Sequence, residues 1–401
     1  MSKLALLGGS PAYTGSRIYW HMYGEKDAAA LKEVADSGVI KNGVQLEKFK
    51  KNFGEFAKTE YVLPVANGTV SIELILRTLG IGYGDEVIVP PYTFIASVSS
   101  ILYSGALPVF ADVDPSTFLI DPKAVEKKIT SKTKAVLGVH VGGRPCDLDA
   151  LKELCDKHGL YLIEDCAQAV GSEWNGVHVG LHGAFGSIST QNSKNLSCGE
   201  GGIVLTSNKE LYEKALEIYN GGFVDGKYAV PGQIRVPGEM QCAILNSQLE
   251  ALPEQIAKRE ENVNYFLELT KDFTFLIPLK KDDRITRDSR HLLIMRLNAP
   301  LLKDVGREKF LKALNAEGVP FGPGYIAPCH TAQTLQSPYV ETMTGRKMDL
   351  SGKTLPVCER LSFVDGIWCY HTFFLGTKAD MEMAANAFEK VYANLDELKN
   401  I

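Results

Sequence analysis

The chain has 401 residues, 45% of them apolar and 23% charged, with a formal net charge of −5. This length accommodates two packed domains, because a single core rarely grows beyond about 250–300 residues, and the acidic balance argues against nucleic acid or a membrane as the main partner, since both select for clustered Lys and Arg. No apolar run is long enough for a secretion signal or a membrane span, and the eight cysteines form no C-x-x-C pair, so we expect a cytoplasmic protein without a metal site.

Short apolar runs rich in Val and Ile alternate with amphipathic segments through the first part of the chain. The runs predict strands at residues 62–66, 86–90, 107–113, 135–141, 160–164, 186–191 and 203–206. The segments between them predict helices, among them 71–79, 122–129 and 148–158. Continuous apolar strands that alternate with helices indicate an α/β fold with a mostly parallel sheet, whose ligand lies beyond the C-terminal ends of the strands.

The pattern changes after residue 245. Residues 246–265 predict one long, highly charged helix, and residues 379–398 predict a final helix. Mixed strands, helices and Pro- and Gly-bearing loops lie between the two. We therefore predict a large α/β domain over residues 1–250, which holds the ligand site at the strand ends, and a small C-terminal α+β domain over residues 251–401.

Two carboxylates end the buried-type strand at residues 160–165, and the second of them is Asp165. A carboxylate at the C-terminal end of a parallel strand points into the ligand crevice. Pyridoxal 5'-phosphate requires such a group, because its ring nitrogen must stay protonated for the ring to withdraw electrons. The alternative is a helix N-cap or a solvated loop charge.

A lysine follows 29 residues later, at position 194, on a glycine-flanked loop after another strand. Burial would lower the pKa of its amine and make it a usable nucleophile and proton carrier. Taken alone, Lys194 is more commonly a solvated surface residue. Its order after Asp165 is what indicates a cofactor site.

Asn67-Gly68-Thr69 lies between a predicted strand and a predicted helix. Glycine lets the backbone approach a phosphate, and the first N–H groups of the helix favour an anion. A plain Asn-Gly turn, or an N-cap at Thr69, is the alternative. Ser189 and Gln191 could reach the same phosphate, and Phe94 could stack on the cofactor ring or serve as a core aromatic.

Five segments together are similar to the DegT/StrS family of sugar aminotransferases, which have the aspartate-aminotransferase fold type (fold type I). They are NGT (67–69), GDEVIVPPYTFIAS (84–97), FADVDPSTFLIDP (110–122), EDCAQAVGS (164–172) and SKNLSCGEGG (193–202). They follow one another in the order and spacing of the family. The resemblance implies a pyridoxal-phosphate-dependent aminotransferase.

The resemblance also implies roles for single residues. Lys194 corresponds to the Schiff-base lysine, Asp165 to the partner of the pyridine nitrogen, and Gln168 to a contact of the cofactor ring. The phosphate contacts correspond to Gly68, Thr69 and Ser189, and the stacking position to Phe94. Family members form homodimers with active sites shared across the interface. By the same resemblance, the substrate pocket would include Trp20, His291, Tyr325, His330 and His371.

The spacing of Ser189, Gln191 and Lys194, and the run 325–330, are more similar to the branch that acts on cyclitol ketones. That branch includes scyllo-inosose aminotransferases and 3-amino-5-hydroxybenzoate synthases, and its usual donor is L-glutamine. We therefore expect amino transfer from L-glutamine or L-glutamate to a ketone on a sugar or cyclitol, as in aminocyclitol antibiotic biosynthesis. A nucleotide-linked ketosugar is the alternative acceptor.

Two other functions are less well supported by the sequence. Family members that dehydrate sugars carry His in place of the lysine, and Lys194 is present here. A cofactor-binding regulator would usually carry an added DNA-binding module, for which the N-terminal segment is short. One departure from the family concerns its Asn-x-Arg segment, whose Asn reaches the phosphate of the partner subunit. Here the corresponding residues are Gln233-Ile234-Arg235, ahead of Glu239.

Overall fold

The computed structural model describes residues 2–15, 18–20, 22–348, 350 and 354–399. Its centre is a seven-stranded sheet with the order β1-β9-β8-β5-β4-β2-β3. The strands are β1 (Tyr61–Val65), β2 (Glu86–Val89), β3 (Leu107–Phe110), β4 (Thr133–Val139), β5 (Tyr161–Asp165), β8 (Phe185–Ser189) and β9 (Gly202–Thr206). Five neighbouring strands from β3 to β8 run parallel, and β9 runs antiparallel to both of its neighbours. The predicted mostly parallel sheet is confirmed.

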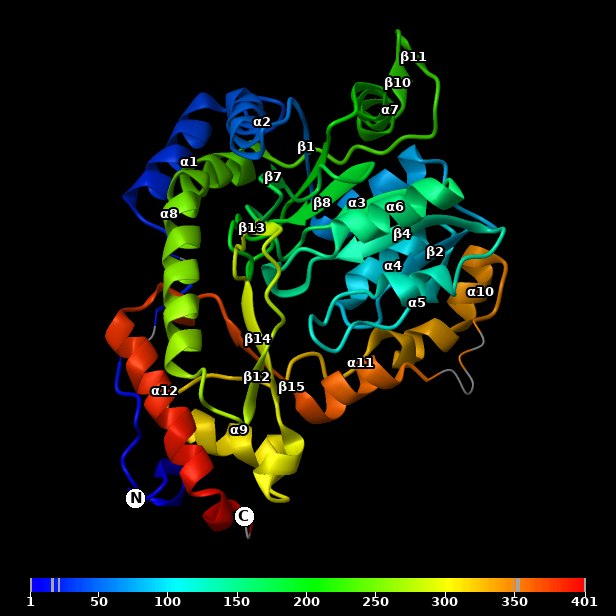
Figure 1. Cartoon of the computed structure of the whole chain (residues 1–401). Helices are drawn as coiled ribbons and strands as arrows, with labels where there is room; N and C mark the ends of the chain where they lie inside the picture. Colours follow the sequence, from blue (N-terminus) through cyan, green and yellow to red (C-terminus); the bar gives the residue numbers. More distant parts are fainter. Residues whose placement is uncertain (1, 16–17, 21, 349, 351–353, 400–401) are drawn as a thin grey trace.

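Helices cover this sheet, as the continuous apolar strands required. Figure 1 shows α3 (Gly68–Thr78), α4 (Ile95–Tyr103) and α6 (Leu148–His158) packed around it. All residues of β2, β8 and β9 are buried, which is typical of strands that lie between two helical layers. The short helix α5 (Pro122–Glu126) begins after the cap residue Asp121. The segment 80–84 joins α3 to β2 as a loop.

The long helix α8 (Glu239–Leu269) has 31 residues and extends beyond both predicted ends. Its first half packs on α1 (Glu25–Ser37) and α2 (Val44–Ala57), and its second half packs on α12 (Lys378–Ala393). The helix is continuous through residue 250. The division into two domains at that residue stays a prediction.

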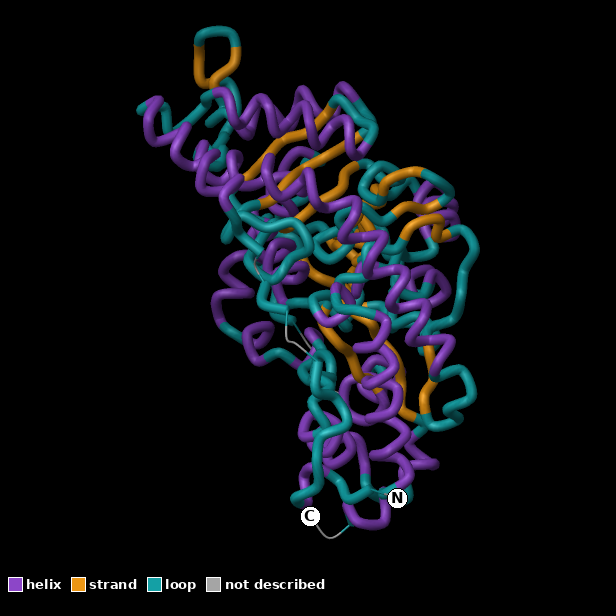
Figure 2. Tube along the Cα trace, turned by 90° about the vertical axis from the view of Figure 1, so that its left-hand side faces the viewer, coloured by secondary structure: helices purple, strands orange, loops and turns teal. Residues whose placement is uncertain are grey.

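A second buried apolar cluster surrounds the small antiparallel sheet β12-β14-β15. Its strands are β12 (Leu276–Pro278), β14 (Leu292–Leu297) and β15 (Gly366–Tyr370). The cluster includes residues of α9 (Gly306–Ala316) and α12, together with Leu4 and Tyr13 from the N-terminal segment. In Figures 1 and 2 the two ends of the chain accordingly lie close together at this end of the molecule.

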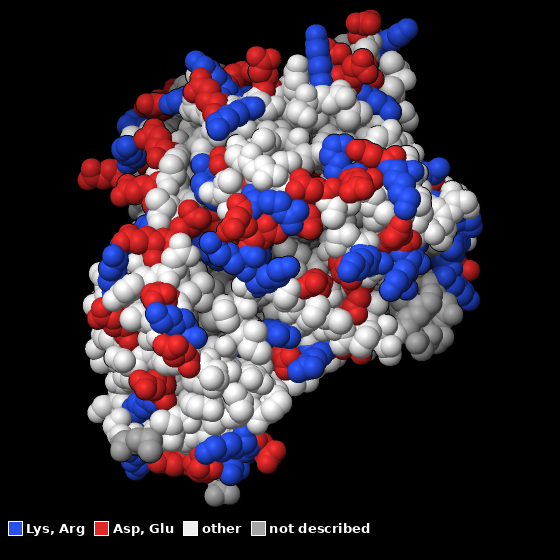
Figure 3. All heavy atoms as spheres, in the orientation of Figure 1, with Lys and Arg blue, Asp and Glu red and all other residues white. Residues whose placement is uncertain are grey.

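Charges of both signs are interspersed over the face shown in Figure 3. Several of them form exposed pairs within one helix, such as Lys152 with Asp156 at 2.7 Å. Exposed pairs of this kind contribute little to stability, about 0.3–0.5 kcal/mol each. Among the described helices, none is long and apolar enough to cross a membrane.

Candidate active site

A cavity of about 550 Å³ opens beyond the C-terminal ends of the parallel strands, where the fold places a ligand. Most of the residues singled out in the sequence line it: Gly68, Thr69, Phe94, Asp165, Gln168, Ser189, Gln191, Lys194, His291 and Tyr325. Trp20, His330 and His371 are not among its lining residues. The sheet thus brings together side chains that are far apart in the sequence.

Asp165 is the last residue of β5 and is buried. Its Oδ2 accepts a hydrogen bond of 2.7 Å from Ser97 Oγ on α4, and its Oδ1 accepts one of 3.0 Å from the N–H of Ala167. These two donors fix the carboxylate at the base of the cavity. A fixed carboxylate in this place can hold a proton on a ring nitrogen.

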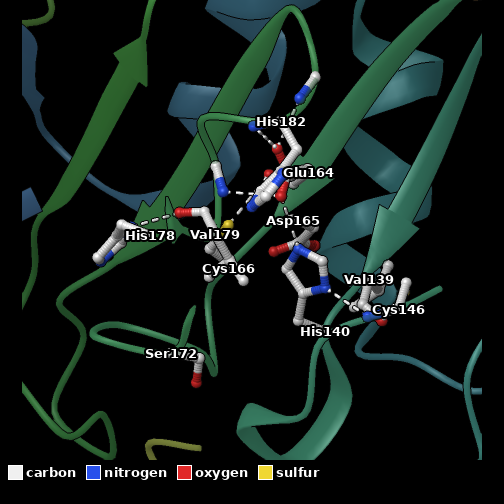
Figure 4. A network of polar contacts seen from close by, with 12 residues as sticks. Val139, His140, Cys146, Glu164, Asp165, Cys166, Ser172, His178, Val179 and His182 are labelled. Atoms are coloured by element: carbon white, nitrogen blue, oxygen red, sulfur yellow. Dashed lines mark hydrogen bonds and ion pairs between the residues drawn. The ribbon is translucent and has the colours of Figure 1, made fainter. Parts of the chain in front are cut away.

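The preceding residue, Glu164, points to the other side of the strand (Figure 4) and is fully buried. His140 Nε2 lies 3.1 Å from its Oε2. Its two oxygens also accept bonds of 2.7–2.9 Å from three N–H groups in the loop before β8, those of Gly180, His182 and Gly183. Burial would raise the pKa of Glu164, but the His140 bond, nearby positive charge and the backbone donors outweigh burial and lower it.

The possible ligand atoms of His140, Glu164 and Cys166 lie within 4.8 Å of one another. Both Glu164 oxygens are already occupied by hydrogen bonds, and His140 Nδ1 accepts the N–H of Cys146 at 3.0 Å. The backbone N–H of His140 also bonds to the carbonyl of Asp165 at 3.0 Å. We therefore interpret the group as a hydrogen-bonded brace that fixes the end of β5.

Lys194 lies on the loop between β8 and β9 and is partly buried. Its N–H bonds to the carbonyl of Gln191 at 2.9 Å, which tightens the turn. Burial lowers the pKa of its amine below the usual value, and the nearby Asp165 carboxylate opposes this shift. A lysine with a lowered pKa is a better nucleophile and proton acceptor near neutral pH.

Asn67 caps α3, because its Oδ1 accepts the N–H of Val70 at 2.9 Å. Thr69 is therefore not the cap, and the triplet is not an isolated turn. The first N–H groups of a helix have no intrahelical acceptor, so those of Gly68 and Thr69 remain for an anion beside the cavity. A Cβ at Gly68 would lie only 2.8 Å from Ser189 Cβ, so glycine permits the close approach of α3 to β8. This donor set fits the phosphate of pyridoxal phosphate.

The remaining wall of the cavity is largely aromatic. Phe94 is 60% exposed at the start of α4. Tyr325 packs edge-on against Trp368, with ring centroids 4.7 Å apart. Its hydroxyl accepts a bond of 2.8 Å from Gln168 Nε2, and the Gln168 Oε1 accepts the N–H of Gly142 at 2.7 Å. Gln168 is thus held from both ends of its amide.

Three of the residues expected in the substrate pocket have other neighbours. His330 Nε2 bonds to Glu359 at 3.0 Å. His371 Nε2 bonds to the carbonyl of Ser193 at 3.1 Å, and the ring of Trp20 stands at 90° to the His371 ring with centroids 4.6 Å apart. These positions favour structural roles.

The sequence analysis missed Ser97, Trp368, Tyr370 and Glu200, which also contribute to the site or its lining. Ser97 ends the family-like segment 84–97, which was the available signal. Trp368 and Tyr370 lie on β15 in the second half of the chain, where no local motif marked them.

In the segment 233–239, which departs from the family pattern, the two charged residues contact other parts of the same chain. Arg235 is buried and pairs with Glu73 at 3.1 Å. Glu239 accepts N–H bonds of 2.7–3.2 Å at the start of α2, from Gly43, Gln45 and Leu46. Both charged residues therefore stabilise their own chain, while Gln233 is exposed.

Comparison with known proteins identifies the family of this chain. The fold and the site define a pyridoxal-phosphate-dependent aminotransferase. The model of the DegT/DnrJ/EryC1/StrS aminotransferase family matches residues 22–359, and the chain belongs to this family.

The chain is 34% identical, over 97% of its own length and 97% of the relative, to the L-glutamine:2-deoxy-scyllo-inosose aminotransferase of Streptomyces paromomycinus. Over 49% of its length and 54% of the relative, it is 44% identical to the GDP-perosamine synthase of Vibrio cholerae. Among solved structures, 3-amino-5-hydroxybenzoic acid synthase is similar, with a TM-score of 0.83 and 26% identity over 94% of this chain and 99% of that one.

Proposed function

We propose that this aminotransferase moves an amino group from L-glutamine to the ketone of an uncharged cyclitol. The observation that carries the proposal is the charge of the cavity. Among its described lining residues, Lys194 is the only Lys or Arg. A nucleotide-linked sugar carries a diphosphate, which proteins usually bind with Arg or Lys side chains. The scyllo-inosose aminotransferase relative supports the same choice.

Different groups of the cavity would have different roles in the reaction. Bound pyridoxal phosphate supplies the electron sink for a carbanion. The N–H groups of Gly68 and Thr69 would hold its phosphate, and Asp165 would keep a proton on its ring nitrogen. Lys194 would bind the cofactor covalently, and its freed Nζ would accept a proton from the α carbon of the donor and later deliver it. The lowered pKa of Lys194 suits both tasks.

A homodimer is part of the proposal. The hairpin of β10 (Phe223–Val224) and β11 (Lys227–Tyr228) projects from the molecule (Figures 1 and 2). Its aromatic residues are 52% and 83% exposed, and Ile234 beside it is 68% exposed. Exposed apolar residues on a projecting element favour contact with a second copy. Sedimentation of the holoenzyme would test this, and a monomer at micromolar concentration would contradict it.

The function is tested with the purified holoenzyme. L-glutamine or L-glutamate is added, and the loss of the absorption band of the covalently bound cofactor is followed. Either 2-deoxy-scyllo-inosose or a nucleotide-linked ketosugar is then added as the amino acceptor. We expect the cyclitol to restore the band. Restoration by the nucleotide sugar alone would overturn the choice of acceptor, and release of ammonia or water without an aminated product would favour the dehydratase.

The role of Lys194 has its own test. K194A should lose turnover and the absorbance of the covalently bound cofactor, whereas K132A, at an exposed loop lysine, should retain both. Turnover by K194A would refute the assignment.

A further inference from the structure

Two buried histidines lie side by side where the small sheet meets the lysine loop. His291 directly precedes β14 and His371 directly follows β15. The two strands pair antiparallel with Leu292 opposite Tyr370, so the histidines form the next pair, and the N–H of His371 bonds to the carbonyl of His291 at 3.0 Å. Their rings stack with centroids 5.4 Å apart and planes at 25°.

Each histidine contacts one of the two residues that flank Lys194. His371 Nε2 lies 3.1 Å from the carbonyl oxygen of Ser193. His291 Nδ1 lies 2.9 Å from Oδ1 of Asn195. The lysine backbone is therefore held from both sides by a pair of side chains that belong to the second half of the chain.

The surrounding bonds determine which nitrogen carries the proton. A carbonyl oxygen only accepts, so His371 must donate from Nε2. The Asn195 amide donates its Nδ2 to the carbonyl of Ser289 at 2.8 Å, so its Oδ1 faces His291 and accepts from Nδ1. Arg259 Nε donates to the same Ser289 carbonyl at 3.1 Å and fixes it from the other side.

We propose that His291 and His371 are positioning residues, which hold the backbone of Lys194 still while its side chain moves between the cofactor and the substrate. This inference rests on the proposed role of Lys194. The sequence analysis expected both histidines in the substrate pocket, and of the two only His291 lines the cavity.

Proton transfer by Lys194 requires that its backbone be held in place. The lysine side chain is long and flexible, and the proton must reach carbon atoms in a defined geometry. A displacement of about 1 Å can lower a rate by about 100-fold, so the backbone anchor sets the precision of the transfer. Burial and the nearby charge of Lys194 keep the pKa of His291 well below its usual value, so His291 adds no positive charge that would disfavour protonation of the lysine.

The test uses the holoenzyme and replaces each imidazole in two ways. H371F and H291F keep a ring but remove the donor. H371Q restores a donor at the position of Nε2, and H291N restores one at the position of Nδ1. The matched control is H158F, at an exposed histidine on α6.

We expect the phenylalanine variants to lower kcat of the donor half-reaction by about 10- to 100-fold, with donor KM changed by less than about threefold. The pH midpoint of the bound-cofactor absorbance should also shift in these variants. H371Q and H291N should recover wild-type kcat to within about threefold. If H371F does not fold, H371N replaces it, because its shorter amide does not reach the Ser193 carbonyl.

Two results would overturn the inference alone: phenylalanine variants with kcat and absorbance midpoint unchanged, or amide variants as impaired as the phenylalanine variants. In both cases K194A would still be inactive. Turnover by K194A would instead overturn the proposed function, and the inference with it.

Discussion

Replacing Gly68 by alanine would place a methyl group between α3 and β8. The added carbon would lie 2.8 Å from Ser189 Cβ and 3.2 Å from Ser189 Oγ. Carbon atoms in contact normally lie about 3.5–4.0 Å apart, so Ser189 or the start of α3 must move by roughly 1 Å. Overpacking of this kind costs about 1–3 kcal/mol. Alanine is favoured over glycine in a helix by at most about 1 kcal/mol, which offsets part of this cost in the apoenzyme.

The same displacement moves the N–H groups that we assign to the phosphate. We therefore expect G68A to weaken cofactor binding by about 10- to 100-fold, which corresponds to about 1.4–2.8 kcal/mol, while the melting temperature of the apoenzyme falls by no more than about 2–4 °C per kcal/mol of the remaining packing cost. Titration of the apoenzyme with pyridoxal phosphate, followed by absorbance, measures the affinity. G24A is the matched control, because no atom lies within 4 Å of a Cβ at Gly24.

A double-mutant cycle separates the steric effect from loss of the serine hydroxyl. S189G removes both the hydroxyl and the carbon that G68A meets, whereas S189A removes only the hydroxyl. The G68A substitution should therefore cost little in the S189G background and its full amount in the S189A background. Equal costs in both backgrounds, or binding by G68A within about twofold of wild type, would refute the steric explanation.

Two further substitutions test the base of the cavity and a buried histidine. S97A removes the 2.7 Å hydrogen bond to Asp165. Because hydrogen bonds to charged groups contribute about 1.5–3 kcal/mol, kcat/KM should fall about 10- to 100-fold. The control S99A should match wild type, and an S97A enzyme with unchanged kcat/KM would contradict the role of Ser97. Burial lowers the pKa of His178 to about 4 in the folded protein. As pH falls, His178 therefore binds a proton in the unfolded chain before it does so in the folded protein. The free energy of unfolding should accordingly decrease between about pH 6.5 and about 4. Urea unfolding across this range should show a smaller decrease for H178Q than for wild type or H158Q, and equal decreases would count against the explanation.

The central sheet could be predicted because its signals are local. Every predicted strand is present, although the strand predicted at residues 107–113 ends at Phe110. The runs that form β2, β8 and β9 are buried along their whole length. Each strand can therefore be identified from its own residues, without knowledge of the strands beside it. The long helix was predicted too short, because helix ends depend on partners elsewhere in the chain. Glu239 begins α8 and also caps α2.

The positions of Asn67, Asp165 and Lys194 after their strands determined, from the sequence alone, that these residues meet at one cavity, because parallel strands bring their C-terminal ends to one edge. Only the tertiary structure decided what surrounds these groups. Ser97 bonds to Asp165 across 68 positions, and His371 bonds beside Lys194 across 178. Such contacts leave no periodicity or spacing in the sequence, since they depend on how two sheets and a helix pack together.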